Sequence, residues 1–237
     1  MKNKGSIAIL GGMGPQASAK LLEVLFDVCV KDFGAKSDSD FPEVILNSVP
    51  VPNFISDRKN SEFALKILEK RVKKLESFNP VCFGISCNTA HVLLDNLQSK
   101  TNVPFVSIID EVAKKVTDSK IKKIGLLGTP VTIDSALYQN ALKKQKIEII
   151  VPSRERSKIV EDIVRKVLRG KADVKDAQQL SKVAKSLKRN GAQGIILGCT
   201  ELPLIFSKTF PMLVFDSIEI LAKGLLRKFF ETDLKNN

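Results

Sequence analysis

The chain alternates short apolar runs, typical of buried strands, with longer amphipathic stretches, typical of helices, from its start to its end. We expect strands at residues 6–10, 43–49, 81–87, 104–108, 124–129, 147–151, 194–198 and 212–215. We expect helices at residues 20–33, 61–78, 88–97, 133–144, 155–169, 173–190 and from 216 onward. Such regular alternation predicts an α/β fold in which helices flank mostly parallel sheets.

The pattern restarts halfway along the chain. Ala8 and Ile124 begin similar units of strand and glycine turn 116 residues apart, and Cys87 and Cys199 end similar strands 112 residues apart. The near-equal offsets indicate an internal duplication and two pseudo-symmetric α/β domains that face each other. Ligands of parallel sheets bind beyond the carboxyl ends of the strands, so both cysteines should face one cleft between the domains.

Composition limits the class of protein. A chain of 237 residues can form one large or two ordinary domains, and its 43% hydrophobic and 27% charged residues are typical of a soluble globular protein. No apolar run approaches the roughly 18 residues of a membrane helix, and the start does not resemble a signal peptide. We therefore expect a cytoplasmic protein with reduced cysteines and no membrane partner. The cysteine spacings fit neither a zinc site nor a CxxC pair, so we expect no metal.

The net charge of +12 lies mostly in the second half, where residues 117–237 contain 23 basic and 13 acidic side chains. A basic half can indicate a nucleic-acid partner. However, the lysines follow the polar faces of expected helices, and the chain has one Tyr and no Trp to stack on bases. We interpret the excess as a solvated basic surface and expect no nucleic-acid partner.

Cys87 and Cys199 each end a strand directly before a helical start, where backbone N–H groups favour negative charge and lower a cysteine pKa. Two thiols facing one cleft suit a reaction in which one thiolate removes a proton and one thiol returns a proton to the opposite face of the same carbon. A cysteine is otherwise commonly a small buried apolar residue. We assign that interpretation to Cys29 and Cys82, which lie inside apolar patterns.

Polar residues follow both cysteines. Asn88, Thr89 and Thr200 can donate hydrogen bonds to a substrate carboxylate and stabilise enolate-like charge. Glu201 can bind a substrate ammonium or tune Cys199, or it is simply a residue of a first helical turn. His91, the single histidine, lies four residues after Cys87 and either reaches the site or packs under the turn.

The sequence Gly12-x-Gly14-x-x-Ala17 after the first strand resembles a dinucleotide-binding fingerprint. The second strand, however, ends without an acidic residue for a ribose hydroxyl, and Pro15 narrows the turn. We therefore interpret these glycines as a tight strand-to-helix turn and expect no nicotinamide cofactor.

Four motifs together resemble the aspartate/glutamate racemase superfamily, and its aspartate racemase branch in particular: GGMGP at residues 11–15, CNTAH at 87–91, LLGT at 126–129 and GCTEL at 198–202. The resemblance implies a cofactor-independent racemase of two pseudo-symmetric domains, a homodimer, and a last helix that returns to the first domain. On this basis we expect a first domain of residues 1–115 joined by helix 216–237, and a second domain of residues 116–215.

The resemblance also implies roles for particular residues. The family's two catalytic cysteines correspond to Cys87 and Cys199, its carboxylate-binding pair to Asn88 and Thr89, and a substrate-binding lysine to Lys158. Further candidates for substrate contacts are Met13, Gln16, Thr200 and Glu201.

The sequence departs from aspartate racemases at one place, where a Pro-Asp-Arg stretch supplies an arginine for the substrate's distal carboxylate. Here the matching residues are Pro52-Asn53-Phe54, so that Asn53 and the nearby Arg58 are the candidates. Aspartate is the leading expected substrate, before glutamate or a related amino acid. The alternatives are another reaction of the superfamily (maleate-type isomerase, hydantoin racemase or malonate decarboxylase) and a non-catalytic small-molecule binder.

Overall fold

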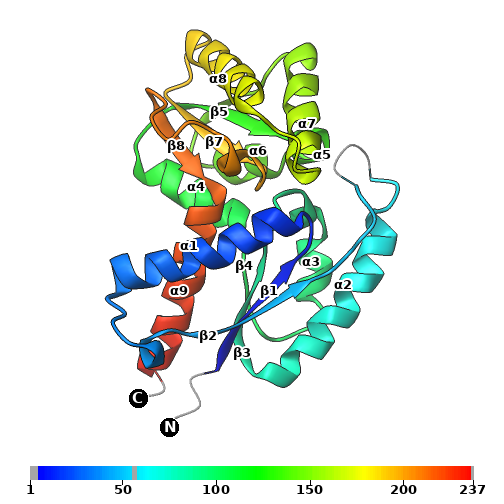
Figure 1. Cartoon of the computed structure of the whole chain (residues 1–237), viewed down its shortest axis with the longest axis vertical. Helices are drawn as coiled ribbons and strands as arrows, with labels where there is room; N and C mark the ends of the chain where they lie inside the picture. The colour runs from blue at the N-terminus through cyan, green and yellow to red at the C-terminus, as the bar shows by residue number, and fades with distance from the viewer. Residues whose placement is uncertain (1–4, 55–57, 236–237) are drawn as a thin grey trace.

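The first half of the chain forms a four-stranded parallel sheet in a computed structural model that describes residues 5–54 and 58–235 (Figure 1). Its strand order is β2-β1-β3-β4. The strands are β1 (Ser6–Gly11), β2 (Glu43–Ser48), β3 (Pro80–Ile85) and β4 (Phe105–Val106). β1 and β3 form the centre of the sheet and are almost completely buried, as their continuous apolar sequences predict.

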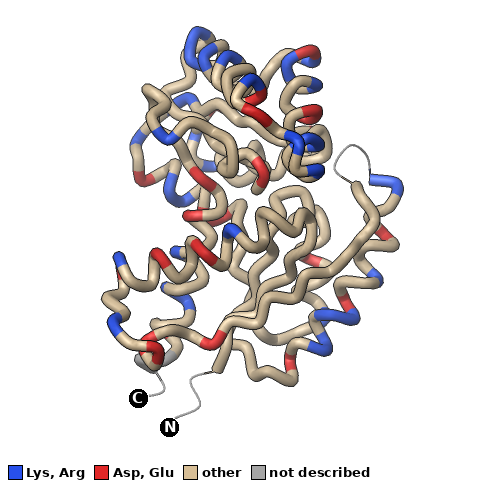
Figure 2. Tube along the Cα trace, in the orientation of Figure 1, with Lys and Arg blue, Asp and Glu red and all other residues tan. Residues whose placement is uncertain are grey.

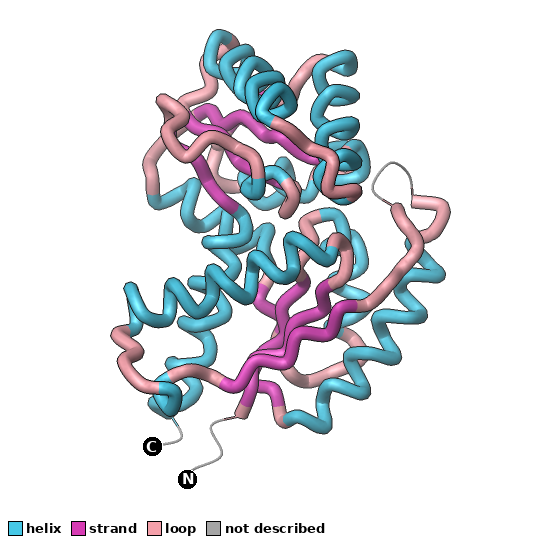
Figure 3. The backbone as a smooth tube through the Cα atoms, viewed as in Figure 1, coloured by secondary structure: helices cyan, strands magenta, loops and turns pink. Residues whose placement is uncertain are grey.

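The second half repeats this arrangement with the strand order β6-β5-β7-β8, again parallel throughout. The strands are β5 (Lys123–Gly128), β6 (Glu148–Ile150), β7 (Gly194–Gly198) and β8 (Leu213–Asp216). Helices lie against both sheets (Figure 3). The predicted α/β class with two pseudo-symmetric parallel sheets is therefore confirmed.

The α-helices follow the strands of each half in turn. They are α1 (Pro15–Phe33), α2 (Ser61–Leu75), α3 (Leu94–Gln98), α4 (Ile108–Asp118), α5 (Pro130–Asp134), α6 (Leu137–Lys143), α7 (Arg154–Leu168), α8 (Val174–Arg189) and α9 (Ser217–Lys235). Short 3₁₀ helices are η1 (Asp38–Asp40), η2 (Glu76–Phe78), η3 (Thr89–Leu93) and η4 (Leu202–Leu204). α1 begins at a proline and ends before Gly34 in the left-handed conformation, which are favoured residues at these two positions.

Two expected helices differ from prediction. The expected helix 88–97 begins as the 3₁₀ helix η3 and becomes α-helical only in α3. The expected helix 133–144 is divided into α5 and α6, because Ala136 takes up the left-handed conformation with φ of 54°. Both breaks lie beside residues of the candidate site.

α4 was not predicted from the sequence, although its pattern is amphipathic. Ile108, Val112 and Val116 are buried on one face, and the Ser107 side chain accepts the N–H of Asp110 to cap the first turn. The expected strand 104–108 therefore stops at Val106, and the apolar residues after it belong to the helix.

The last helix of each half packs against the other half. α4 contacts α6 and β8, α9 contacts α1 and β3, and α4 and α9 contact each other. One continuous hydrophobic cluster consequently contains residues of both sheets, such as Ile9 and Ile196. The expected boundary between residues 115 and 116 falls inside α4 and stays a prediction.

Charge is distributed over the outer surface. Lys182, Lys185, Lys188 and Arg189 on α8 are all exposed, in agreement with a solvated basic surface (Figure 2). Among the helices of residues 5–54 and 58–235, none has the length and apolar character needed to cross a membrane.

Candidate active site

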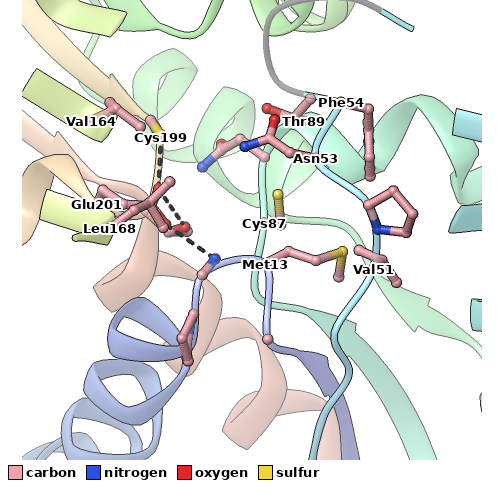
Figure 4. Close-up of a pocket in the computed structure, with 16 residues that line it drawn as sticks. Met13, Val51, Asn53, Phe54, Cys87, Thr89, Val164, Leu168, Cys199 and Glu201 are labelled. Atoms are coloured by element: carbon pink, nitrogen blue, oxygen red, sulfur yellow. Dashed lines mark hydrogen bonds between the residues drawn. The ribbon is translucent and has the colours of Figure 1, made fainter. Parts of the chain in front are cut away.

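A pocket between the two halves of the chain holds most of the predicted site residues (Figure 4). Its cavity of about 120 Å³ suits a small metabolite, since pockets for larger ligands commonly measure about 300–1,000 Å³. The lining groups with polar or reactive atoms are Gly12, Gly14, Asn53, Cys87, Asn88, Thr89, Cys199, Thr200 and Glu201. The apolar lining residues are Met13, Pro15, Val51, Pro52, Phe54, Val164 and Leu168.

Cys87 follows β3 and Cys199 follows β7, so the two thiols enter the pocket from equivalent positions of the two sheets. Each thiol is 5% exposed, and both are free cysteines. Their side chains are drawn on opposite sides of the pocket in Figure 4. The expectation that both cysteines face one cleft therefore agrees with the geometry, whereas their catalytic role stays a prediction.

The pKa of Cys87 is raised to about 12, which corrects the prediction that the helical start would lower it. Burial of the thiol has the largest effect, and the charge of Glu201 raises the pKa further. The N–H groups of Ala90 and Thr89 and the Thr89 hydroxyl do favour the thiolate, as predicted, but they do not outweigh burial.

The pKa of Cys199 is raised well above its usual value, first by burial and then by the charge of Glu201. Its Sγ donates a hydrogen bond of 2.9 Å to Glu201 Oε2. The charge of Cys87 makes a smaller contribution that also raises the pKa of Cys199. Neither thiol therefore ionises readily near neutral pH.

Glu201 is 4% exposed, and burial raises the pKa of its carboxyl. Its Oε1 accepts a hydrogen bond of 3.1 Å from the N–H of Gly14, and its Oε2 accepts the Cys199 thiol. A Cβ on Gly14 would lie 2.3 Å from Leu168 Cδ2 and 2.9 Å from Glu201 Oε1. The glycine turn therefore positions the carboxylate and brings α1 against α7.

Asn88 and Thr89 form hydrogen bonds with side chains from the second half of the chain. The sequence did not predict these contacts. Tyr138 donates a hydrogen bond of 2.5 Å to Asn88 Oδ1, and Asn88 Nδ2 donates to Ser217 Oγ at 3.1 Å. Burial raises the pKa of Tyr138, so its hydroxyl keeps the proton that it donates.

The hydroxyl of Thr89 lies 2.9 Å from that of Thr129 and 3.0 Å from that of Thr132. The hydroxyls of Thr129 and Thr132 are also 3.0 Å apart, so the three form a buried ring. Thr129 belongs to the LLGT motif, which was the available sign of this role; nothing in the local sequence identifies Thr132. These contacts orient the residues after Cys87 across the boundary between the halves.

His91 packs under the turn, which was one of its two predicted positions. Its Nδ1 lies 2.8 Å from the carbonyl oxygen of Cys87, and its Nε2 accepts the N–H of Ile108 at 3.0 Å. With Nε2 as acceptor, Nδ1 carries the proton and donates to Cys87. His91 is absent from the described lining of the pocket and is a positioning residue.

The stability of the protein is expected to fall by about 2–3 kcal/mol between pH 7 and pH 4.5 because of His91. Burial lowers the pKa of His91 from 6.5 to about 4. The unfolded chain binds this proton first, so the stabilisation is present above pH 6.5 and is lost as the pH falls toward 4. Urea unfolding at the two pH values should show a smaller decrease for His91→Gln, which does not titrate. An equal decrease in both proteins would contradict this role.

Three predicted substrate-binding residues lie outside the pocket lining. Arg58 donates a hydrogen bond of 2.5 Å to Ser135 Oγ, and Gln16 Nε2 donates to the carbonyl of Leu168 at 3.3 Å. Lys158 is exposed and lines a separate cavity near Pro130 at the start of α7. In contrast, Val164 and Leu168 of α7 line the pocket without having been predicted, because only the tertiary packing brings α7 to the site.

The geometry combines two opposed thiols, a buried carboxylate and neutral hydrogen-bond donors. This set can hold an amino acid's charged groups and exchange a proton on either face of its α-carbon. Across residues 5–54 and 58–235, no three His, Cys, Asp or Glu side chains gather closely enough to bind a metal ion.

Comparison with known proteins agrees with this geometry. The family model described as Asp/Glu/hydantoin racemase matches residues 10–225. The broad specificity amino-acid racemase RacX of Bacillus subtilis is 37% identical over 146 residues, which are 61% of this chain and 63% of RacX. The match thus spans less than two thirds of that relative's length.

Solved structures are similar over almost the whole chain. Aspartate racemase from Picrophilus torridus has a TM-score of 0.81 and 29% identity, covering 95% of each chain. An aspartate racemase homologue from Pyrococcus horikoshii OT3 has a TM-score of 0.78 and 29% identity, covering 95% of this chain and 99% of the other.

Proposed function

Because this chain belongs to the Asp/Glu/hydantoin racemase family, as its motifs predicted, we propose that it is a cofactor-independent amino-acid racemase. Cys87 and Cys199 are its two proton-transfer groups. The observation that supports this most is the entry of both thiols into one small pocket from equivalent strand ends of the two halves.

The substrate's charged groups match the polar lining. Its carboxylate accepts hydrogen bonds from Thr89 and the backbone N–H groups after Cys87, and its ammonium lies beside Glu201, whose Oε2 also accepts the Thr200 hydroxyl at 3.4 Å. Neutral donors that bind the carboxylate also stabilise the enolate-like charge that develops when the α-proton leaves.

Proton transfer uses the two thiols in opposite states. One cysteine, as thiolate, takes the α-proton and becomes a thiol, while the electron pair of the broken C–H bond delocalises toward the carboxylate. The other cysteine, as thiol, then gives its proton to the opposite face of the carbon and becomes the thiolate. The product is the mirror image of the substrate, and exchange with water restores the starting protonation.

Substrate binding itself promotes ionisation. Burial and the charge of Glu201 raise the pKa of both thiols. A substrate ammonium placed between these groups favours a thiolate, because an opposite charge stabilises the ionised form. Glu201 stays the carboxylate that faces this ammonium and accepts the Cys199 thiol in a hydrogen bond. The thiolate fraction is therefore expected to increase when substrate binds.

Aspartate, expected from the sequence, is the first substrate to assay, because the similar protein from Picrophilus torridus is an aspartate racemase. Glutamate and other amino acids belong in the same assay, since RacX is described as having broad specificity. The proposal includes a cytoplasmic homodimer, as the resemblance implies.

Incubation in deuterated water tests the proposal. We expect deuterium to enter the α-carbon of at least one L-amino acid and of its D-enantiomer, with inversion seen by chiral chromatography. Proton NMR measures the exchange, and addition of a pyridoxal trap should not slow it. Exchange with no amino acid would contradict the proposal, and turnover of hydantoins alone would identify another reaction of the family.

A further inference from the structure

The ionisable side chains of the described pocket lining carry negative charge only. Glu201 is the one acidic or basic side chain among the described residues that line it, and it is buried. The other polar side chains of the lining, Asn53, Asn88, Thr89 and Thr200, are neutral. The negative charge of Glu201 lies at the reacting groups, because its Oε2 accepts the Cys199 thiol at 2.9 Å. The interior of the pocket therefore disfavours additional negative charge.

Three candidate cations have partners or positions outside the pocket lining. The Arg58 guanidinium donates to Ser135, and Lys158 lies at another cavity. Arg165, one turn from Leu168 on α7, pairs with Glu161 at 2.8 Å. The segment 55–57 has the sequence Ile-Ser-Asp, which contains no basic residue. In the described part of the chain, the lining thus offers no cation to a second carboxylate.

Apolar side chains fill the remaining walls. Met13, Val51 and Phe54 come from the first half and belong to the hydrophobic cluster that contains Cys87. Val164 and Leu168 face them from the second half and belong to the cluster that contains Cys199. Figure 4 shows the two groups on opposite sides of the thiols. Apart from the Asn53 amide, the side chains of the pocket outside the reacting groups are therefore hydrocarbon.

Charge balance separates two classes of substrate. An amino acid with a neutral side chain enters as a zwitterion, and its ammonium and carboxylate meet Glu201 and the neutral donors. Aspartate or glutamate brings one more negative charge, which would lose its water shell beside Glu201 without gaining a counter-ion. An apolar side chain instead gains from burial against Met13, Phe54 and Leu168.

We infer that this site takes an amino acid with an uncharged, apolar side chain in preference to a dicarboxylic amino acid. The inference rests on the proposed function for the orientation of the substrate, and it narrows the class of substrate. It replaces aspartate as the leading candidate.

Binding of leucine, asparagine and aspartate to the wild-type enzyme tests the inference, because their side chains share one branched shape and differ in polarity and charge. Isothermal titration calorimetry should give the order leucine, asparagine, aspartate, with leucine at least about tenfold tighter than aspartate. Aspartate binding as tightly as leucine, or the absence of binding by all three, would overturn the inference.

A pair of variants tests whether the lack of a cation in the pocket wall causes the preference against aspartate. Phe54→Arg should increase the ratio of aspartate to leucine affinity by about 10- to 100-fold, because it adds a cation to the pocket wall. Phe54→Gln, which removes the ring without adding charge, should not favour aspartate in this way. If wild-type enzyme prefers aspartate and Arg58→Gln abolishes that preference, Arg58 reaches the pocket and the inference is wrong.

Failure of the inference can be distinguished from failure of the proposed function. Binding of leucine over aspartate without solvent exchange at any α-carbon would support the specificity and reject racemisation. Exchange with aspartate together with tighter aspartate binding would support racemisation and reject the specificity.

Discussion

Replacing either Cys87 or Cys199 with serine is expected to lower racemisation in both directions by about 10²- to 10⁴-fold. A hydroxyl ionises much less readily than a thiol, and each direction of the reaction needs one proton acceptor and one proton donor. The two residues occupy equivalent strand ends in one pocket, so neither can substitute for the other. Chiral chromatography of the product from each enantiomer measures the loss.

The sharper measurement is hydrogen exchange without inversion. A variant that keeps one cysteine should still exchange the α-proton of the single enantiomer that faces this thiol, and the other variant should exchange the opposite enantiomer. Cys29→Ala is a suitable control, because Cys29 is buried in the core and absent from the described lining. Full racemisation by either serine variant would exclude that cysteine from the mechanism.

Changing Glu201 to glutamine is expected to make the two thiols ionise more readily in the substrate-free enzyme and to lower the rate of turnover. The carboxylate charge raises the pKa of Cys87 and Cys199, so its removal should lower both pKa values and increase the thiolate fraction at a given pH. Iodoacetamide should then alkylate the substrate-free variant at lower pH than the wild-type enzyme.

Turnover of the same variant should fall by about 10²-fold or more, because glutamine carries no charge to neutralise the substrate ammonium. Glu148→Gln is a matched control, since Glu148 is exposed, pairs with Lys123 at 2.8 Å and is absent from the described pocket lining. An unchanged alkylation profile would show that the charge of Glu201 does not reach the thiols. Unchanged turnover would exclude Glu201 as the partner of the substrate ammonium.

Local sequence patterns were sufficient for most of the fold. The apolar runs of β1, β3, β5 and β7 are continuous because these central strands are buried on both faces. The end of each run therefore marks the carboxyl end of the strand in the sequence. α4 was missed because β4 contains only two residues, and the apolar residues after it extend the same run into the helix.

The site was predicted less completely, because much of it depends on how the halves pack. The residues next to each cysteine follow from the chain itself. The raised pKa values depend on burial, the support of Asn88 by Tyr138 depends on the second half, and the wall formed by Leu168 depends on where α7 lies. No local pattern contains that information. Lys158 was expected in the pocket from the family resemblance, and Arg58 as the arginine near the altered Pro52-Asn53-Phe54 stretch, but neither belongs to the described lining.

Each half of the chain gives its last helix, α4 or α9, to the other half, and this exchange is consistent with an origin from two copies of one ancestral unit. Each helix follows the last strand of one half and packs against the other. A single ancestral half, folded alone, would have left the apolar face of this helix in water. Two identical copies that swapped their last helices would have covered both faces. Gene fusion of such a swapped pair would give the present chain, with one thiol inherited from each copy.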